Sequence, residues 1–209
     1  MAKYEIKDGV CVISKRTKAI ADNAFRNCTE LKQIEIPNSV TSIGSGAFQG
    51  CTGLISITIP DSVTEIGGGE VGLRPWVATV KGAFSGCTSL TSITIPKSVT
   101  VLGDLTFSGC TALKDIILPE TLVKIGRYAF YGCTSLENIV IPASVKYFGH
   151  SIPKGAASNF QGNPFEECTA LKSITMTEDL IKGIQIADGL YGTDDTRFYE
   201  TIKALIIQQ

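Results

Sequence analysis

Short stretches in which apolar and polar residues alternate recur along the chain, and most end at a proline. Ile34 and Ile36, for example, alternate with polar residues just before Pro37. This period of two predicts a strand with one buried face, and proline ends the strand because it has no N–H to donate. Val40 and Ile43 then predict a second short extended segment.

Each stretch belongs to a longer motif, Ala-Phe-x-Gly-Cys-Thr-x-Leu-x-x-Ile-x-Ile-Pro, that returns at a step of 23 residues. The phenylalanine marks six copies, at Phe25, Phe48, Phe84, Phe107, Phe130 and Phe165. Two steps are longer, at 36 and 35 residues, so each contains one repeat and one insertion, at about 68–81 and 150–162. A fixed period near 23 is typical of a solenoid, in which equivalent residues of successive turns stack.

We therefore predict one repeat domain: a right-handed, leucine-rich-repeat-like coil with a parallel sheet on its concave face. Short extended segments and helical turns form its other sides. The solenoid covers residues 9–176, with an N-terminal cap at 1–8 and a C-terminal cap at 177–209, because its ends would otherwise expose core and sheet edge. The cap ends in a predicted amphipathic helix over 196–209, whose apolar face holds Phe198, Ile202, Leu205 and Ile206.

The seven cysteines favour a structural role. Six follow the repeat phenylalanines by three residues, at Cys28, Cys51, Cys87, Cys110, Cys133 and Cys168. Equivalent positions stack at about 4.8 Å, but their parallel Cβ directions are poorly aimed for a disulfide, and no C-x-x-C pair suggests zinc. We expect thiols that fill an internal column. Cys11, which aligns with Ile34, is also expected in the core.

The extension Ser-Val-Thr-x-Ile-Gly-x-x-Ala-Phe-x-Gly-Cys makes the repeat specific. Over about residues 9–176 the chain resembles the BspA-like leucine-rich repeat family, found in many bacterial surface proteins and in some protists. The resemblance implies a curved, non-enzymatic solenoid, often on secreted or cell-surface proteins that adhere to or bind host or matrix proteins. Ser14, Thr106 and Thr177 depart from the motif, and both insertions lie outside it. The resemblance therefore does not specify what is bound.

Charge and hydropathy narrow the choice of partners. The net charge is −1 and no run of Lys or Arg stands out, which argues against nucleic-acid and anionic-membrane partners. No apolar stretch reaches the roughly 18 residues of a membrane-spanning helix. The first residues contain no apolar signal core. We therefore expect a protein that is either cytoplasmic or begins after a removed export signal.

Signals of enzymatic activity are weak. Residues 67–72 satisfy G-x-G-x-x-G, but Pro75 follows, and dinucleotide binding needs a preceding strand and a following helix. The single histidine, His150, leaves no two-histidine site, and no carboxylate or serine constellation accompanies it. We predict no catalytic residue, no metal and no cofactor.

The insertions are one candidate surface for binding a partner. They contain Arg74, Trp76 and Phe160, and Trp and Arg are enriched at binding hot spots. Both insertions enter at the same point of the coil, three repeats apart, so they would emerge on one side at roughly 15 Å from each other. The alternative is that these side chains pack back on the solenoid, or that the insertions are disordered.

The outward face of the sheet is the other candidate. Its central column consists of Glu35, Thr58, Thr94, Ile117, Val140 and Thr175. Serine and threonine suit an uncharged scaffold as well as a site, but Ile117 beside Val140 predicts a small exposed apolar patch. Thr58 and Thr94 complete the candidate residues on this face.

Together these patterns favour a non-enzymatic protein-binding or adhesion module of a surface or secreted protein. It would bind a host, matrix or other surface protein through the concave sheet and the inserted loops. The alternative is a passive structural spacer, or an intracellular scaffold, without a ligand of its own.

Overall fold

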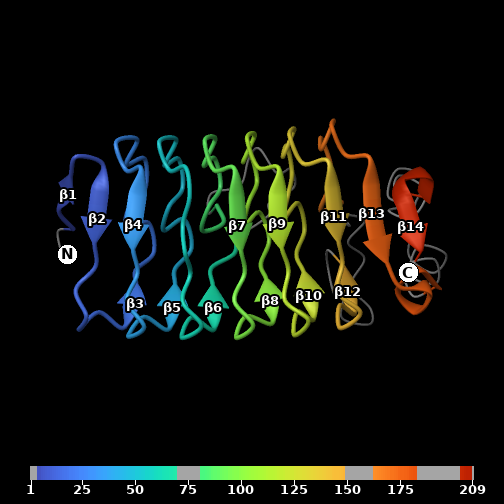
Figure 1. Ribbon diagram of the computed structural model, residues 1–209, viewed down its shortest axis with the longest axis horizontal. Coiled ribbons are helices and arrows are strands. Elements are labelled where there is room, and N and C mark those ends of the chain that lie inside the picture. Colours follow the sequence, from blue (N-terminus) through green and yellow to red (C-terminus); the bar gives the residue numbers. More distant parts are fainter. Residues whose placement is uncertain (1–3, 70–80, 149–161, 183–202, 209) are drawn as a thin grey trace, which may run out of the picture.

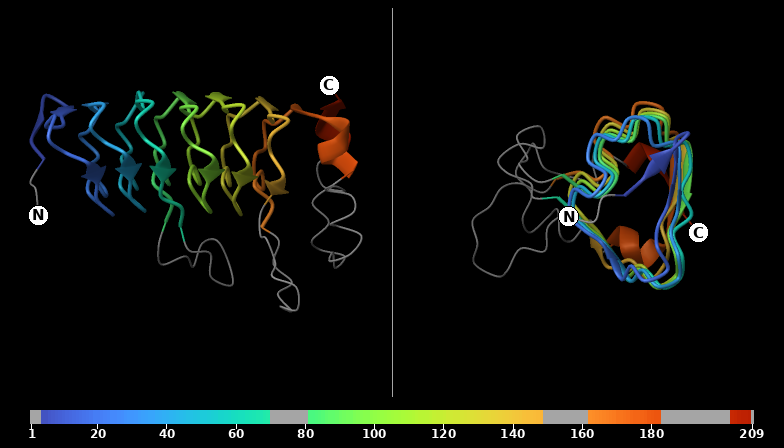
Figure 2. Two further views of the ribbon diagram at one scale, coloured as in Figure 1. Left: turned by 90° about the horizontal axis from the view of Figure 1, so that it is seen from below. Right: turned by 90° about the vertical axis from the view of Figure 1, so that its left-hand side faces the viewer.

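The computed structural model describes residues 4–69, 81–148, 162–182 and 203–208. They form a stack of turns, one for each repeat (Figure 1), as the period predicts. Seen end-on, the turns superpose (Figure 2). The stack is close to straight in these views, so the expected curvature is slight.

One side of the stack is formed by parallel strands, one from each turn but one. They are β2 (Val10–Val12), β4 (Gln33–Glu35), β7 (Ser92–Thr94), β9 (Asp115–Ile117), β11 (Asn138–Val140) and β13 (Ser173–Met176). In the three-residue strands the middle residue points inward and its neighbours outward, so Cys11 pairs with Ile34, as its alignment predicts, and Ile93 with Ile116. The turn between β4 and β7 has no strand among its described residues on this side and pairs with β7 through a single bridge, Thr58 to Thr94. We call the outward side of these strands the strand face.

A second set of parallel strands lies across the core from the strand face (Figure 2). They are β3 (Ala19–Ile20), β5 (Ser42–Ile43), β6 (Glu65–Ile66), β8 (Val101–Leu102), β10 (Lys124–Ile125) and β12 (Tyr147–Phe148). The second residue of each strand points inward, as in the pairs Ile20–Ile43 and Leu102–Ile125. This set corresponds to the second extended segment of each repeat.

The third side of each turn, which carries the phenylalanine, is a run of overlapping reverse turns, not the helical turn that we predicted. The Cys51 N–H donates to the Phe48 carbonyl, three residues back, at 3.1 Å. The Phe48 N–H instead donates to Ala83 of the next turn, at 2.7 Å. Gly46 and Gly50 adopt positive φ angles of 62° and 69°, a region open to glycine. Bonding to the next turn thus replaces the helical hydrogen-bond pattern.

The repeat phenylalanines form a continuous stack through the core. Neighbouring ring centroids from Phe25 to Phe165 lie 5.3–5.7 Å apart, with planes within 7° of parallel. Tyr4 closes the N-terminal end of the stack, 4.5 Å from Phe25. Offset aromatic pairs add about 0.5–1.5 kcal/mol each beyond the area they bury.

The cysteine column lies beside this stack, and all seven thiols are free, as predicted. Each of five thiols donates to the phenylalanine carbonyl of the preceding turn, at Sγ–O distances of 3.0–3.2 Å: Cys51, Cys87, Cys110, Cys133 and Cys168. At the corner after the proline, a column of serine hydroxyls also donates hydrogen bonds to backbone carbonyls of the preceding turn. There Ser62 donates to Val40 at 2.7 Å, and Ser144 to Leu122 at 2.6 Å.

The two ends are closed in different ways. At the N-terminus, β1 (Ile6–Lys7) pairs antiparallel with β2. At the C-terminus, β14 (Ile206–Gln208) pairs parallel with β13, after a 3₁₀ turn, η2 (Lys203–Leu205). Residues 203–208 are therefore not in the amphipathic helix that we predicted, because the free edge of β13 offers backbone groups that a strand can pair. The rest of that predicted helix lies outside the described residues.

Phe107→Ala should lower the free energy of unfolding by about 3–5 kcal/mol, because it opens a cavity between two stacked rings. Chemical denaturation followed by circular dichroism measures the change. Tyr147→Ala is the matched control: Tyr147 is 50% exposed on the second sheet, and its loss should change stability by about 0.5 kcal/mol or less. Equal effects of the two substitutions would contradict the importance of the stack.

Candidate functional site

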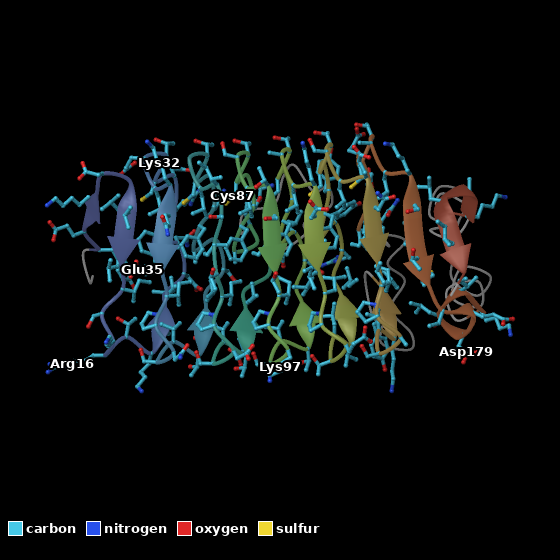
Figure 3. The ribbon with its side chains drawn as sticks, viewed as in Figure 1. Arg16, Lys32, Glu35, Cys87, Lys97 and Asp179 are labelled. Carbon is cyan, nitrogen blue, oxygen red and sulfur yellow. The ribbon has the colours of Figure 1, made fainter. Side chains whose placement is uncertain are left out.

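The strand face carries one row of outward side chains that crosses every turn. Strand register aligns the row as Val12, Glu35, Thr58, Thr94, Ile117, Val140, Thr175 and Ile207; Figure 3 labels Glu35 in this row. Ile117 is 64% exposed and Val140 is 53% exposed. They stand on adjacent strands, β9 and β11. The structure thus places these two predicted residues together in an exposed apolar pair.

Burial within the fold does not account for this pair. At equivalent positions of the same row the fold accepts threonine, at Thr94 and Thr175. Isolated apolar residues on a surface are common, but neighbouring ones in the middle of a sheet form a contiguous patch. The pair is therefore available for contact with another molecule.

A shallow groove of about 430 Å³ lies beside the pair on the strand face. Its lining includes Ser56, Thr58, Ser92, Thr94, Asp115 and Ile117. Short serine and threonine side chains leave the hollow, with the inward-pointing Ile57 and Ile93 beneath it. Three candidate residues from the sequence thus share one groove, and the fourth, Val140, stands on the next turn along. Asp115 is a lining residue that the sequence analysis did not single out.

Charged residues surround the groove unevenly. Asp61 and Lys97 form a loose, exposed pair at one edge, with 3.8 Å between Oδ2 and Nζ. On the flank of the face, Lys172 donates to Glu137 at 2.5 Å, and this hydrogen bond lowers the pKa of Glu137. Asp115 forms no ion pair with any residue that the structure describes. The groove therefore presents one uncompensated carboxylate.

The insertion residues cannot be added to this site. Arg74, Trp76 and Phe160 lie outside the described residues. Both insertions follow strands of the second sheet, β6 and β12, and these strands lie across the core from the strand face (Figure 2). The points where the insertions leave the solenoid therefore do not adjoin the groove.

A half-buried ion pair joins two turns on the insertion side. Arg127 donates from Nε and from its backbone N–H to the Asp104 carboxylate, each at 2.8 Å, and its Nη2 lies 2.7 Å from Oδ2. Gly69, at the start of the first insertion, donates to the Asp104 carbonyl at 2.5 Å. These contacts satisfy both charges, so the pair holds adjacent turns together. The sequence could have suggested it only through the 23-residue spacing of the two residues.

The buried thiols lack the properties of a reactive site. Burial raises the pKa of the Cys51 and Cys168 thiols to about 12. Burial also raises the pKa of Cys87, Cys110 and Cys133 well above the ordinary value. The thiolate is the nucleophile and metal ligand, so these side chains remain protonated and inert.

The remaining features of the described residues do not form a chemical site. No three His, Cys, Asp or Glu side chains in this part of the chain come close enough to hold a metal ion. Nor does any helix there have the length and apolar character needed to cross a membrane. A second hollow, of about 500 Å³, lies over β3, β5 and β6. The Asp22 carboxylate in it accepts from the Ser45 N–H at 2.7 Å, which is a structural contact between turns.

Comparison with known sequences gives a specific match. The sequence profile of the BspA type leucine-rich repeat region matches in six copies, over residues 10–70 and 79–185. No curated protein sequence matches the chain.

Solved structures share the architecture. A leucine-rich cell surface protein from Faecalibacterium prausnitzii is 29% identical, with a TM-score of 0.53, and the match covers 81% of this chain and 48% of that one. The chain thus spans about half the length of that relative. The leucine-rich repeat protein of T. pallidum is 21% identical, with a TM-score of 0.57, over 99% of this chain and 94% of that one. At that identity it supports the fold alone.

The thiol column should resist alkylation in the folded protein. At about pH 8, Cys87, Cys110 and Cys133 should remain unmodified by N-ethylmaleimide, because burial keeps them as thiols. All seven should react in urea, and peptide mass spectrometry assigns each site. Cys28, which is partly exposed, is the internal reference for a reaction in the folded state. Equal rates for Cys28 and Cys110 would contradict the buried column.

The raised thiol pKa values also predict a stability change at alkaline pH. A folded-state pKa above that of the unfolded chain stabilises the fold below the unfolded pKa, about 8.5 for cysteine. This stabilisation is lost as the pH rises from there toward the folded pKa, about 12 for Cys51. The free energy of unfolding should therefore fall as the pH rises above about 9. Urea titrations of wild type and Cys110→Ala should show a shallower decline in the variant; identical declines would contradict the role of this thiol.

Proposed function

The chain belongs to the BspA-type leucine-rich repeat family, and we propose that it is a protein-binding module whose contact surface is the strand face. One observation carries this proposal. Ile117 and Val140 are neighbouring, exposed and apolar in a row whose nearest members on either side are threonines, Thr94 and Thr175. Contiguous apolar surface of this kind marks protein interaction sites.

The shape of the surface supports a macromolecular partner. The groove is shallow and opens onto the same face as the apolar pair, so a small molecule would stay largely exposed to solvent. Ligand pockets, by contrast, enclose most of their ligand's surface. The strand face is also held rigid by pairing and by the stacked core, so little backbone order has to be gained on binding.

The proposal includes the location of the protein and the class of its partner. The F. prausnitzii relative is described as a cell surface protein, which supports a surface or secreted location for the present chain. In that setting the partner is a host, matrix or other surface protein, and the activity is adhesion. A non-enzymatic role fits a family built from structural repeats and a thiol column held protonated by burial.

A passive spacer is the second candidate function. Serine, threonine and asparagine occupy much of the strand face, as at Ser92, Asn138 and Ser173. Such a surface suits a neutral scaffold that extends an attached domain. The two functions differ in whether any partner depends on Ile117 and Val140.

The double substitution Ile117→Lys/Val140→Lys should weaken partner binding at least about tenfold, because it places charges where an apolar contact forms. Surface plasmon resonance against a panel of purified matrix and bacterial surface proteins measures the effect. Val101→Lys/Tyr147→Lys is the matched control, since both residues are exposed on the second sheet, at 44% and 50%.

Both double variants should retain the unfolding midpoint of the wild type, because all four side chains point outward. Wild-type binding by Ile117→Lys/Val140→Lys, or an equal loss in the control, would overturn the strand face as the contact surface. Absence of binding by the wild-type protein to every member of the panel would favour the spacer.

A further inference from the structure

Strand β9 differs from the preceding strand, β7, at both of its outward positions. In the row of Ile117, the adjacent strand β7 has Thr94. In the row of Asp115, β7 has Ser92, and β11 and β13 have Asn138 and Ser173. The carboxylate is thus the single charge among four aligned strand positions. Asp115 and Ile117 lie two residues apart, so they point to the same side of the sheet, and both line the groove.

Structural contacts do not account for the Asp115 carboxylate. It forms no ion pair and no side-chain hydrogen bond with the residues that the structure describes. By contrast, Asp22 and Asp104 each accept a backbone N–H from the next turn. Serine or asparagine serves at the aligned positions. The fold therefore does not require a charge at residue 115.

The charges around the groove define what could occupy it. Asp61 lies at the other edge, paired only loosely with Lys97 (Figure 3), and the Lys97 side chain is 80% exposed. An exposed pair at 3.8 Å contributes little and exchanges readily. The groove therefore has acidic residues at both edges, hydroxyls between them and the exposed aliphatic side chain of Ile117. These groups repel an acidic ligand and complement a basic one.

Resting on the function proposed above, we propose that this groove receives an arginine or lysine side chain of the protein partner, with an adjacent aliphatic residue packed on Ile117 and Val140. A guanidinium can bind the Asp115 carboxylate with two parallel hydrogen bonds. The hydroxyls of Ser92 and Thr94 accept further N–H groups. The methylenes of the basic side chain lie along Ile117, as such stems do on apolar surface.

The test uses short synthetic peptides that present Arg-Leu, Glu-Leu or Arg-Ser in a common Gly/Ser background. They are titrated into the ¹⁵N-labelled full chain and followed by amide chemical shifts. The Arg-Leu peptide should shift the amides of residues 56–59, 92–95 and 115–117. The Glu-Leu peptide should leave them unchanged, and Arg-Ser should bind more weakly. Absent shifts with Arg-Leu, or equal shifts with Glu-Leu, would overturn the proposal.

Substitutions test whether the preference for the Arg-Leu peptide depends on the Asp115 carboxylate. Asp115→Asn should weaken Arg-Leu binding about threefold to fivefold, in line with the loss of an exposed ion pair, and added salt should reduce the wild-type affinity in the same direction. Asp179→Asn makes the same change of charge at an exposed residue of the helical segment 178–182 (Figure 3) and should have no effect. Wild-type affinity in Asp115→Asn, or an equal loss in Asp179→Asn, would contradict the inference.

This outcome is separable from a failure of the proposed function. If a protein partner loses binding to Ile117→Lys/Val140→Lys but binds Asp115→Asn normally and without salt dependence, the strand face stands as the contact surface and the basic anchor is wrong. If Arg-Leu binds the groove but no protein depends on Ile117 and Val140, the groove has its predicted preference and the wider binding face is wrong.

Discussion

The whole structure depends on register: each turn must place the same residue over the same residue of the turn before it. Backbone hydrogen bonds enforce this on all three sides, as between Ile95 and Ile117, Phe84 and Thr106, and Gly126 and Leu102, at 2.8–3.0 Å. In the core, the same register stacks the phenylalanines and lets five of the cysteine thiols donate to the phenylalanine carbonyl of the preceding turn. A change at one position therefore acts on two interfaces.

This constraint explains how much could be predicted from the sequence. Residues that repeat every 23 positions report on stacked contacts, so the strands, the phenylalanine stack and the free internal cysteines followed from the motif. The reverse turns did not, because a Phe at i and a Cys at i+3 suit a helical turn locally, and only bonding to the next turn excludes it. Residues 206–208 were misassigned for a similar reason: their pairing partner, β13, lies some thirty residues earlier in the chain.

Function is expected where the constraint is absent, at outward positions that the fold leaves free to vary. The sequence identified Ile117 and Val140 by their departure from a threonine row, and the structure confirms that they are exposed neighbours. It did not identify Asp115, because the groove exists only through the short side chains of two earlier turns, Ser56 and Ser92 among them. The depth of the groove depends on side chains of neighbouring turns, which a single repeat does not contain. β9 thereby becomes the centre of the proposed site.

Two internal deletions test the register most directly. Removing residues 93–115 joins Ser92 to Ile116 and takes out one whole repeat of 23 residues. Removing residues 93–116 takes out one residue more, which sends inward side chains outward in the joined strand. Urea unfolding followed by circular dichroism should show a cooperative transition for the first deletion and a strongly destabilised or unfolded second one. Equal unfolding midpoints for the two proteins would contradict the account.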